Sequence, residues 1–119
     1  MTVLLDTHAA LWLTTDDAQL GKRSRRLIQQ ALTNDGLLIS TISFWEIALL
    51  LERGRLQTSL SATTLRENML QSGFVEIPLS GEIALLATQL NLHGDPADRF
   101  IAASALITTA TLVTADERL

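Results

Sequence analysis

Four short apolar runs, separated by segments with helical patterning, constrain the fold of this chain more than any other feature. The runs predict strands over residues 2–6, 37–41, 74–77 and 111–115. Between and beside them the sequence predicts helices over residues 7–13, 18–33, 43–53, 61–72, 80–91 and 96–109. Strands that alternate with helices in this way form a parallel sheet covered on both faces. We therefore expect a single α/β domain over residues 1–119, with three layers (α/β/α) around a parallel sheet of four to five strands.

Acidic residues follow the predicted strands, at the edge where such sheets form their functional crevice. Asp6 ends the first apolar run and Asp116 follows the last one. Glu46 and Asp98 fall in the first turns of two predicted helices. In open α/β sheets, residues far apart in sequence converge outside the carboxyl ends of the strands. Because carboxylate oxygens suit Mg²⁺ or Mn²⁺ better than zinc, these four residues predict a site for one of those ions.

Most of these acids also have a purely structural interpretation, which the sequence leaves open. Ser43 and Glu46 fit a capping box, in which the glutamate accepts a hydrogen bond from the backbone N–H of the serine. Asp95 fits the N-cap of the next helix, with Asp98 at its third position, where negative charge is favoured. Asp116 equally suits a turn after a strand. Independent caps have no reason to share one edge of one sheet, so the joint placement favours the metal site.

A cluster of carboxylates at one sheet edge predicts a reaction class as well as a ligand. Carboxylates a few ångströms apart repel each other, and a cation relieves that repulsion. One or two divalent ions could then activate water and stabilise the charge that develops on a phosphodiester. The expected reaction is phosphodiester hydrolysis, and it requires no nucleophilic side chain.

The charge and cysteine content exclude several other classes of protein. With 9 Lys and Arg against 13 Asp and Glu, the net charge of −4 argues against a protein that coats nucleic acid by bulk attraction. The absence of cysteine excludes disulfides, thiolate zinc sites and a cysteine nucleophile. Four basic residues nevertheless cluster within five positions, where they form either an RNA-binding patch or a solvated helix face: Lys22, Arg23, Arg25 and Arg26.

The chain is also unusually apolar for its size. Hydrophobic residues make up 47% of it and the mean hydropathy is +0.25, so we expect a second chain to cover part of the surface, in a dimer or with another partner. No apolar run approaches the roughly 18 residues that cross a bilayer. The N-terminus also lacks the basic stretch of a signal peptide, and the expected location is cytoplasmic.

Four sequence blocks, in order and across nearly the whole chain, resemble the signature blocks of PIN-domain ribonucleases. They read LLDTHAALW (4–12), STISFWEIA (40–48), HGDPADR (93–99) and LVTAD (112–116). More narrowly they resemble the VapC-type toxins of bacterial toxin–antitoxin pairs. The resemblance implies a Mg²⁺- or Mn²⁺-dependent endoribonuclease that cleaves structured RNA such as transfer or ribosomal RNA. It also implies a toxin homodimer and a small cognate antitoxin protein that blocks the pocket.

By position, the resemblance assigns the family's acidic quartet to Asp6, Glu46, Asp98 and Asp116. Further residues are predicted to lie around that quartet. Thr7 and Thr114 could orient ligands through their hydroxyls. Asp95 is assigned first to helix capping, with a role beside the metal as the alternative, and Arg99 to a salt bridge or a phosphate contact. His8 and His93 could act as general bases but are expected mainly in packing or at the surface. Trp12 and Trp45 could stack on RNA bases but are expected mainly in the core or a dimer interface.

The end of the sequence departs from the family pattern. Family members usually continue past the last block to a final edge strand, whereas this sequence ends at Leu119. Either the sequence is truncated at this point or the sheet lacks that strand, and both alternatives leave the position of Asp116 open. The alternative function is a PIN-like interaction module that binds an antitoxin without catalysis.

Overall fold

A parallel sheet forms the centre of the molecule. The structure, a computed structural model, describes residues 2–34, 36–90 and 95–114. Within these residues the strands are β1 (Val3–Leu5), β2 (Leu37–Ser40), β3 (Phe74–Ile77) and β4 (Thr111–Val113). They lie in the order β3-β2-β1-β4, and all three pairings are parallel. The predicted parallel sheet is confirmed, with four strands in the described part of the chain.

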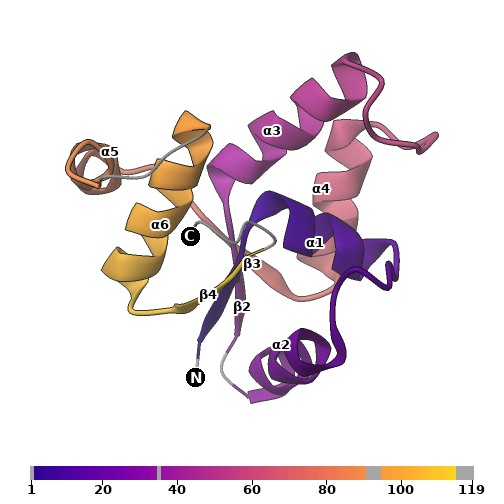
Figure 1. The fold of residues 1–119 in the computed structure, drawn as a ribbon, viewed down its shortest axis with the longest axis horizontal. Helices are drawn as coiled ribbons and strands as arrows, with labels where there is room; N and C mark the ends of the chain where they lie inside the picture. The colour runs from indigo at the N-terminus through magenta and orange to yellow at the C-terminus, as the bar shows by residue number, and fades with distance from the viewer. Residues whose placement is uncertain (1, 35, 91–94, 115–119) are drawn as a thin grey trace.

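Helices cover both faces of the sheet, which gives the predicted three layers (Figure 1). Figure 1 shows α5 and α6 on one side of the sheet and α1, α2 and α4 on the other. The helices are α1 (Thr7–Thr14), α2 (Lys22–Asn34), α3 (Thr41–Glu52), α4 (Ala62–Gln71), α5 (Gly81–Ala87) and α6 (Pro96–Thr108). Among the helices of the described ranges, none is long and apolar enough to cross a membrane.

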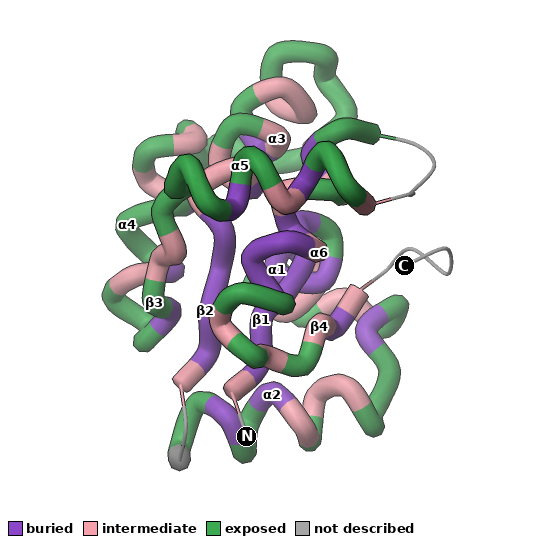
Figure 2. Tube along the Cα trace, turned by 90° about the vertical axis from the view of Figure 1, so that its left-hand side faces the viewer, coloured by how far each residue is buried: buried purple, intermediate pink, exposed green. Residues whose placement is uncertain are grey.

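Successive strand side chains enter two different cores, because neighbours in a strand point to opposite faces of the sheet. Val3 and Leu5 pack into the larger core, which α1, α2 and α4 complete. Leu4 and Leu38 pack with Ile101 of α6 in the second core. β1 and β2 are therefore buried on both faces (Figure 2). This double burial explains why their sequences are continuous apolar runs rather than alternating ones.

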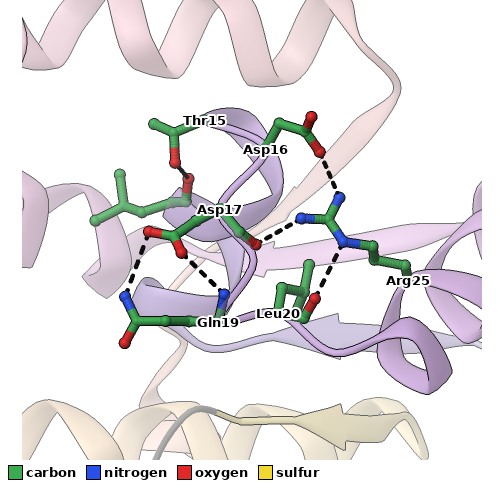
Figure 3. A network of polar contacts seen from close by, with 7 residues as sticks. Thr15, Asp16, Asp17, Gln19, Leu20 and Arg25 are labelled. Atoms are coloured by element: carbon green, nitrogen blue, oxygen red, sulfur yellow. Dashed lines mark hydrogen bonds and ion pairs between the residues drawn. The ribbon is translucent and has the colours of Figure 1, made fainter.

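The second helix begins later than its sequence pattern predicts, at Lys22 rather than near residue 18. Before Lys22 the chain forms a turn, in which the Leu20 N–H donates to the Asp17 carbonyl at 3.1 Å, and the Gly21 carbonyl then accepts a helical hydrogen bond from the Arg25 N–H at 3.0 Å. The guanidinium of Arg25 reaches back to the Asp16 carboxylate at 2.7 Å and to the backbone carbonyls of Asp17 and Leu20 (Figure 3). These local hydrogen bonds stabilise a turn before α2. The predicted helical start near residue 18 was therefore wrong.

The fifth helix ends earlier than predicted, at Ala87 rather than at residue 91. The backbone N–H groups of Thr88, Gln89 and Leu90 donate to carbonyls three residues earlier instead of four. Such tight turns finish a helix by satisfying its last carbonyls. Residues 91–94, which include the predicted site neighbour His93, lie outside the described residues.

Candidate functional site

Asp6 lies at the carboxyl end of β1, and its two carboxylate oxygens contact α1 and the residue that follows β4. It is the N-cap of α1, and its Oδ1 accepts a hydrogen bond from the Ala9 backbone N–H at 2.9 Å. Its Oδ2 accepts a hydrogen bond from the Thr114 hydroxyl. The parallel pairing of Leu5 with Val113 places Thr114 beside Asp6, since the next residue of each strand leaves the sheet at the same edge.

Glu46 lies inside α3, where it does not act as a cap. The N-cap of α3 is Ser40, whose Oγ accepts a hydrogen bond from the Ile42 backbone N–H at 3.2 Å. The predicted helical start at residue 43 and the capping box of Ser43 and Glu46 were therefore wrong. With the helix beginning at Thr41, Glu46 lies one turn further in, and its side chain is available to contact α1.

Thr7 connects the first turn of α1 to Glu46. Its hydroxyl donates a hydrogen bond to Glu46 Oε1 and lies 3.0 Å from Ser43 Oγ. Thr7 and Ser43 are both buried, and Glu46 is half-buried. Asp6 and Glu46, which are 40 positions apart in sequence, are thus each held by a threonine hydroxyl, Thr114 for the first and Thr7 for the second.

The pKa of Glu46 is raised from 4.5 to about 7. Burial is the largest cause, because it disfavours the charged form of the carboxyl group. The hydrogen bond from Thr7 acts in the opposite direction. The negative charges of Asp95, Asp98 and Asp6 raise the pKa further, so each of these three acids lies close enough to Glu46 to interact with it.

The start of α6 contributes two of those acids. Asp95 is the N-cap, and its Oδ1 accepts a hydrogen bond from the Ala97 backbone N–H at 3.0 Å. Pro96 follows at the first helical position, where its missing N–H is not needed. Asp98 is half-buried in the first turn, and its backbone N–H donates to the Asp95 carbonyl at 3.0 Å. The predicted capping role of Asp95 is confirmed.

The donor chemistry of this cluster fits a divalent cation. Its side chains offer carboxylate oxygens, and the pKa of Glu46 is raised first by burial and then by like charges, which a cation would offset. Across residues 2–34, 36–90 and 95–114, however, no three acidic, histidine or cysteine side chains lie close enough together to hold a metal ion. Asp116, the fourth predicted ligand, lies outside the described residues.

The four predicted RNA-binding residues separate into three groups. Arg25 donates hydrogen bonds to the Asp16 carboxylate and to two backbone carbonyls. Arg23 and Arg26 line a cavity of about 520 Å³ between α2 and β4. Thr114, the residue that contacts Asp6, lines the same cavity. Lys22 is exposed at the start of α2 and is not among the residues that line this cavity.

The remaining predicted neighbours lie at the surface or in the packing. His8 is exposed, and its ring lies 6.3 Å from that of Trp12, which packs at the margin of the larger core. Trp45 is 52% exposed on α3, so it does not lie in the core of the single chain, and the predicted alternative of a dimer interface stays a prediction. Arg99 is exposed and, with Phe100, lines a small cavity between α5 and α6.

Ser43 contacts the candidate site, although its place in the sequence predicts only a capping role. The residue is completely buried, and its hydroxyl lies against that of Thr7. Side chains three positions apart share a helix face. The spacing of Ser43 and Glu46 could therefore have shown that both face the same neighbour, once the helix was known to begin at Thr41.

Comparison with known sequences identifies relatives over the full length of the chain. Residues 3–119 match the PIN domain. The chain is 34% identical over 119 residues to Ribonuclease VapC22 of Mycobacterium tuberculosis, a match that covers 99% of this chain and 89% of that protein.

Solved structures show the same fold. VapBC2 of Rickettsia felis, in complex with a DNA fragment from its promoter, superposes with a TM-score of 0.68 at 18% identity and covers 98% of this chain and 88% of that one. A toxin–antitoxin complex from Klebsiella pneumoniae gives a TM-score of 0.64 at 21% identity, with coverage of 96% and 86%. At these identities the likeness concerns the fold.

Proposed function

The chain belongs to the PIN-domain family, as a VapC-type member, and from that premise we propose that it is a metal-dependent endoribonuclease toxin. Its reaction would be hydrolysis of phosphodiester bonds in structured RNA, such as transfer or ribosomal RNA. The observation that carries the proposal is the pairing of Asp6 with Thr114 and of Glu46 with Thr7 at the carboxyl end of β1. Ribonuclease VapC22, the relative at 34% identity, supports RNA as the substrate.

The metal would be Mg²⁺ or Mn²⁺. Four carboxylates would hold it: Asp6, Glu46, Asp98 and Asp116. When bound, the ion supplies electrostatic stabilisation for the charge that develops on the phosphodiester during hydrolysis. The chain's own contribution is to fix the carboxylates before the metal binds. Thr114 and Thr7 do this for Asp6 and Glu46, because each hydrogen bond removes rotational freedom from a ligand.

Arg23 and Arg26 would bind the RNA backbone next to the cleavage site. Thr114, which contacts Asp6, lines the same cavity as these two arginines, so an RNA strand bound in that cavity would lie beside Asp6 and contact both. Arginine pairs well with phosphate, because its planar guanidinium donates two parallel hydrogen bonds. Lys22, at the exposed start of α2, would add a weaker contact. Arg25 would instead stabilise the turn before α2, since its guanidinium is engaged there.

A cognate antitoxin would neutralise the protein, and a homodimer is its proposed assembly. The solved relatives include a toxin–antitoxin complex, and this chain leaves several large apolar side chains exposed. These include Trp45 on α3, Leu85 on α5 and Leu106 on α6. Exposed apolar side chains of this size are typical of protein interfaces.

Cleavage of RNA by the purified protein tests the proposal, with Asp6→Asn as the reference variant. Asparagine caps helices as well as aspartate does, so the variant should keep the N-cap of α1 and fold normally. It removes one negative ligand oxygen. We expect cleavage of total RNA by the wild type with Mg²⁺ or Mn²⁺, no cleavage with chelator, and at least a hundredfold lower rate in the variant, as roughly estimated for a lost transition-state contact.

Two results would contradict the proposal in different ways. Equal cleavage by the wild type and Asp6→Asn would point to a contaminating nuclease. Absence of Mn²⁺ binding by the wild type in calorimetry would favour the alternative of an interaction module without catalysis. Thermal unfolding of both proteins serves as the control for folding.

A further inference from the structure

We propose that Ser43 is a positioning residue, which orients the Thr7 hydroxyl so that its proton points to Glu46. The inference rests on the proposed function, because it assigns a role to a side chain behind a metal-ligating carboxylate. It concerns a contact between two helices, since Thr7 begins α1 while Ser43 and Glu46 lie on α3.

The number of protons on Thr7, Ser43 and Glu46 determines which group donates a hydrogen bond to which. The Thr7 oxygen lies within hydrogen-bond distance of both Ser43 Oγ and Glu46 Oε1. A hydroxyl carries one proton and can therefore donate to only one of these two neighbours at a time. If Thr7 donates to Glu46, the bond between the two hydroxyls must be donated by Ser43.

The opposite order is unfavourable when Glu46 carries a negative charge. Thr7 would then donate to Ser43, and its oxygen would face a carboxylate oxygen without a proton between them. A carboxylate is an acceptor only, so this contact would be repulsive. Donation by Ser43 therefore favours the orientation of Thr7 that holds Glu46 in its charged form, which is the form that binds metal.

The burial of Ser43 and Thr7 makes the direction of these hydrogen bonds important. Ser43 is 0% exposed and Thr7 is 2% exposed, so bulk water does not compete for these hydroxyl protons. In a site of low polarity, hydrogen bonds in a chain also strengthen one another. The side chain of Ser43 thus differs from one that only fills space, because its hydroxyl decides the direction of the bond beside it.

The test measures Mn²⁺ affinity by calorimetry in a double-mutant cycle of Thr7→Val and Ser43→Ala. Removing an outer partner of a metal ligand typically weakens binding by roughly 10- to 100-fold. We expect a loss in that range for Thr7→Val and a loss near its lower end, about tenfold, for Ser43→Ala. Because Ser43 acts through Thr7, adding Ser43→Ala to Thr7→Val should weaken binding by less than about twofold more.

Two further variants separate positioning from packing. Thr7→Ser keeps the hydroxyl and should bind Mn²⁺ within about threefold of the wild type, an estimate from its retained donor. Ser104→Ala is the matched control, because Ser104 is also 0% exposed in a helix but donates to the Phe100 carbonyl of α6. It should leave Mn²⁺ affinity unchanged. On RNA, Ser43→Ala should lower kcat more than it raises KM.

The possible outcomes distinguish failure of the positioning role of Ser43 from failure of the proposed nuclease function. If Ser43→Ala binds Mn²⁺ as tightly as Ser104→Ala does, or if its loss is the same with and without Thr7→Val, the positioning role is wrong while the nuclease proposal stands. If the wild type binds no Mn²⁺, both proposals are wrong. Should Thr7→Val fail to fold in thermal unfolding, the comparison of Ser43→Ala with Ser104→Ala decides the question alone.

Discussion

Asp6 shows that a capping role and a ligand role are compatible in one side chain. One of its oxygens accepts the Ala9 N–H and the other accepts the Thr114 hydroxyl. A carboxylate has about four lone-pair positions, so both bonds leave capacity for a further partner. From the sequence alone, a helix cap and a metal ligand are alternative interpretations of Asp6. At the carboxyl end of a strand that leads directly into a helix, the same residue can do both.

Glu46 should make the stability of the metal-free protein depend on pH. Its pKa is raised from 4.5 to about 7, so the folded protein retains a proton that the unfolded chain releases. The resulting stabilisation is complete below pH 4.5 and is lost as the pH rises through about 7. Since Glu46 is only half-buried and solvent screens its interactions, we expect a loss of about 1–2 kcal/mol between pH 5 and pH 8.

Thermal or urea unfolding in chelator from about pH 5 to pH 8 measures this dependence. Glu46→Gln carries no titrating group, so its free energy of unfolding should vary less over the same range. Glu67→Gln, which replaces an exposed acid on α4, is the control and should follow the wild type. Parallel profiles for the wild type and Glu46→Gln would show that Glu46 does not contribute to the pH dependence.

The presence and order of the strands and helices could be predicted from the sequence, but the start of α2, the end of α5 and the start of α3 could not, and the last of these matters most for the site. Four apolar runs and their spacing were enough to predict the sheet. Both Ser40 and Ser43 are good cap residues, and local propensity does not distinguish them. Tertiary contacts decide the matter: β2 continues to Ser40 beside Ile77 of β3, and the helix starts immediately afterwards. That three-residue difference turns Glu46 from a cap into a side chain facing Thr7.

The turn between α4 and β3 should be sensitive to substitution at Gly73. Its φ of +106° is strained for any residue with a Cβ, and an added Cβ would lie 2.9 Å from Leu32 Cδ1. We expect Gly73→Ala to lower the free energy of unfolding by about 1–2 kcal/mol. Gly81→Ala is the control, because Gly81 begins α5 with open space around it and should be neutral or stabilised by up to about 1 kcal/mol.

Urea unfolding of the two glycine variants compares them directly. A loss of stability in both would indicate a general intolerance of alanine rather than strain at the α4–β3 turn. Equal stability of Gly73→Ala and the wild type would show that the turn can adopt another backbone conformation.

Positive and negative charges are unevenly distributed over the molecule. The chain carries a net charge of −4, and acids gather near Glu46. Arg23 and Arg26 nevertheless face a cavity that adjoins this acidic site through Thr114. Composition could predict that bulk attraction to nucleic acid is weak, and sequence clustering could group four basic residues. Only the structure shows that Arg23 and Arg26 line the cavity, whereas the guanidinium of Arg25 stabilises a turn.

Arg23→Gln/Arg26→Gln should weaken RNA binding and make it less dependent on salt. Each phosphate contact on a single strand adds roughly 0.7 to the slope of log affinity against log salt, so losing two contacts should lower the slope by about 1.4. Fluorescence anisotropy with a labelled single-stranded oligoribonucleotide measures this, in an Asp6→Asn background that leaves the RNA intact. Arg53→Gln/Arg55→Gln removes the same charge at exposed positions after α3 and should change the slope little. An equal change in both double variants would mean that total charge, rather than the cavity beside Thr114, governs binding.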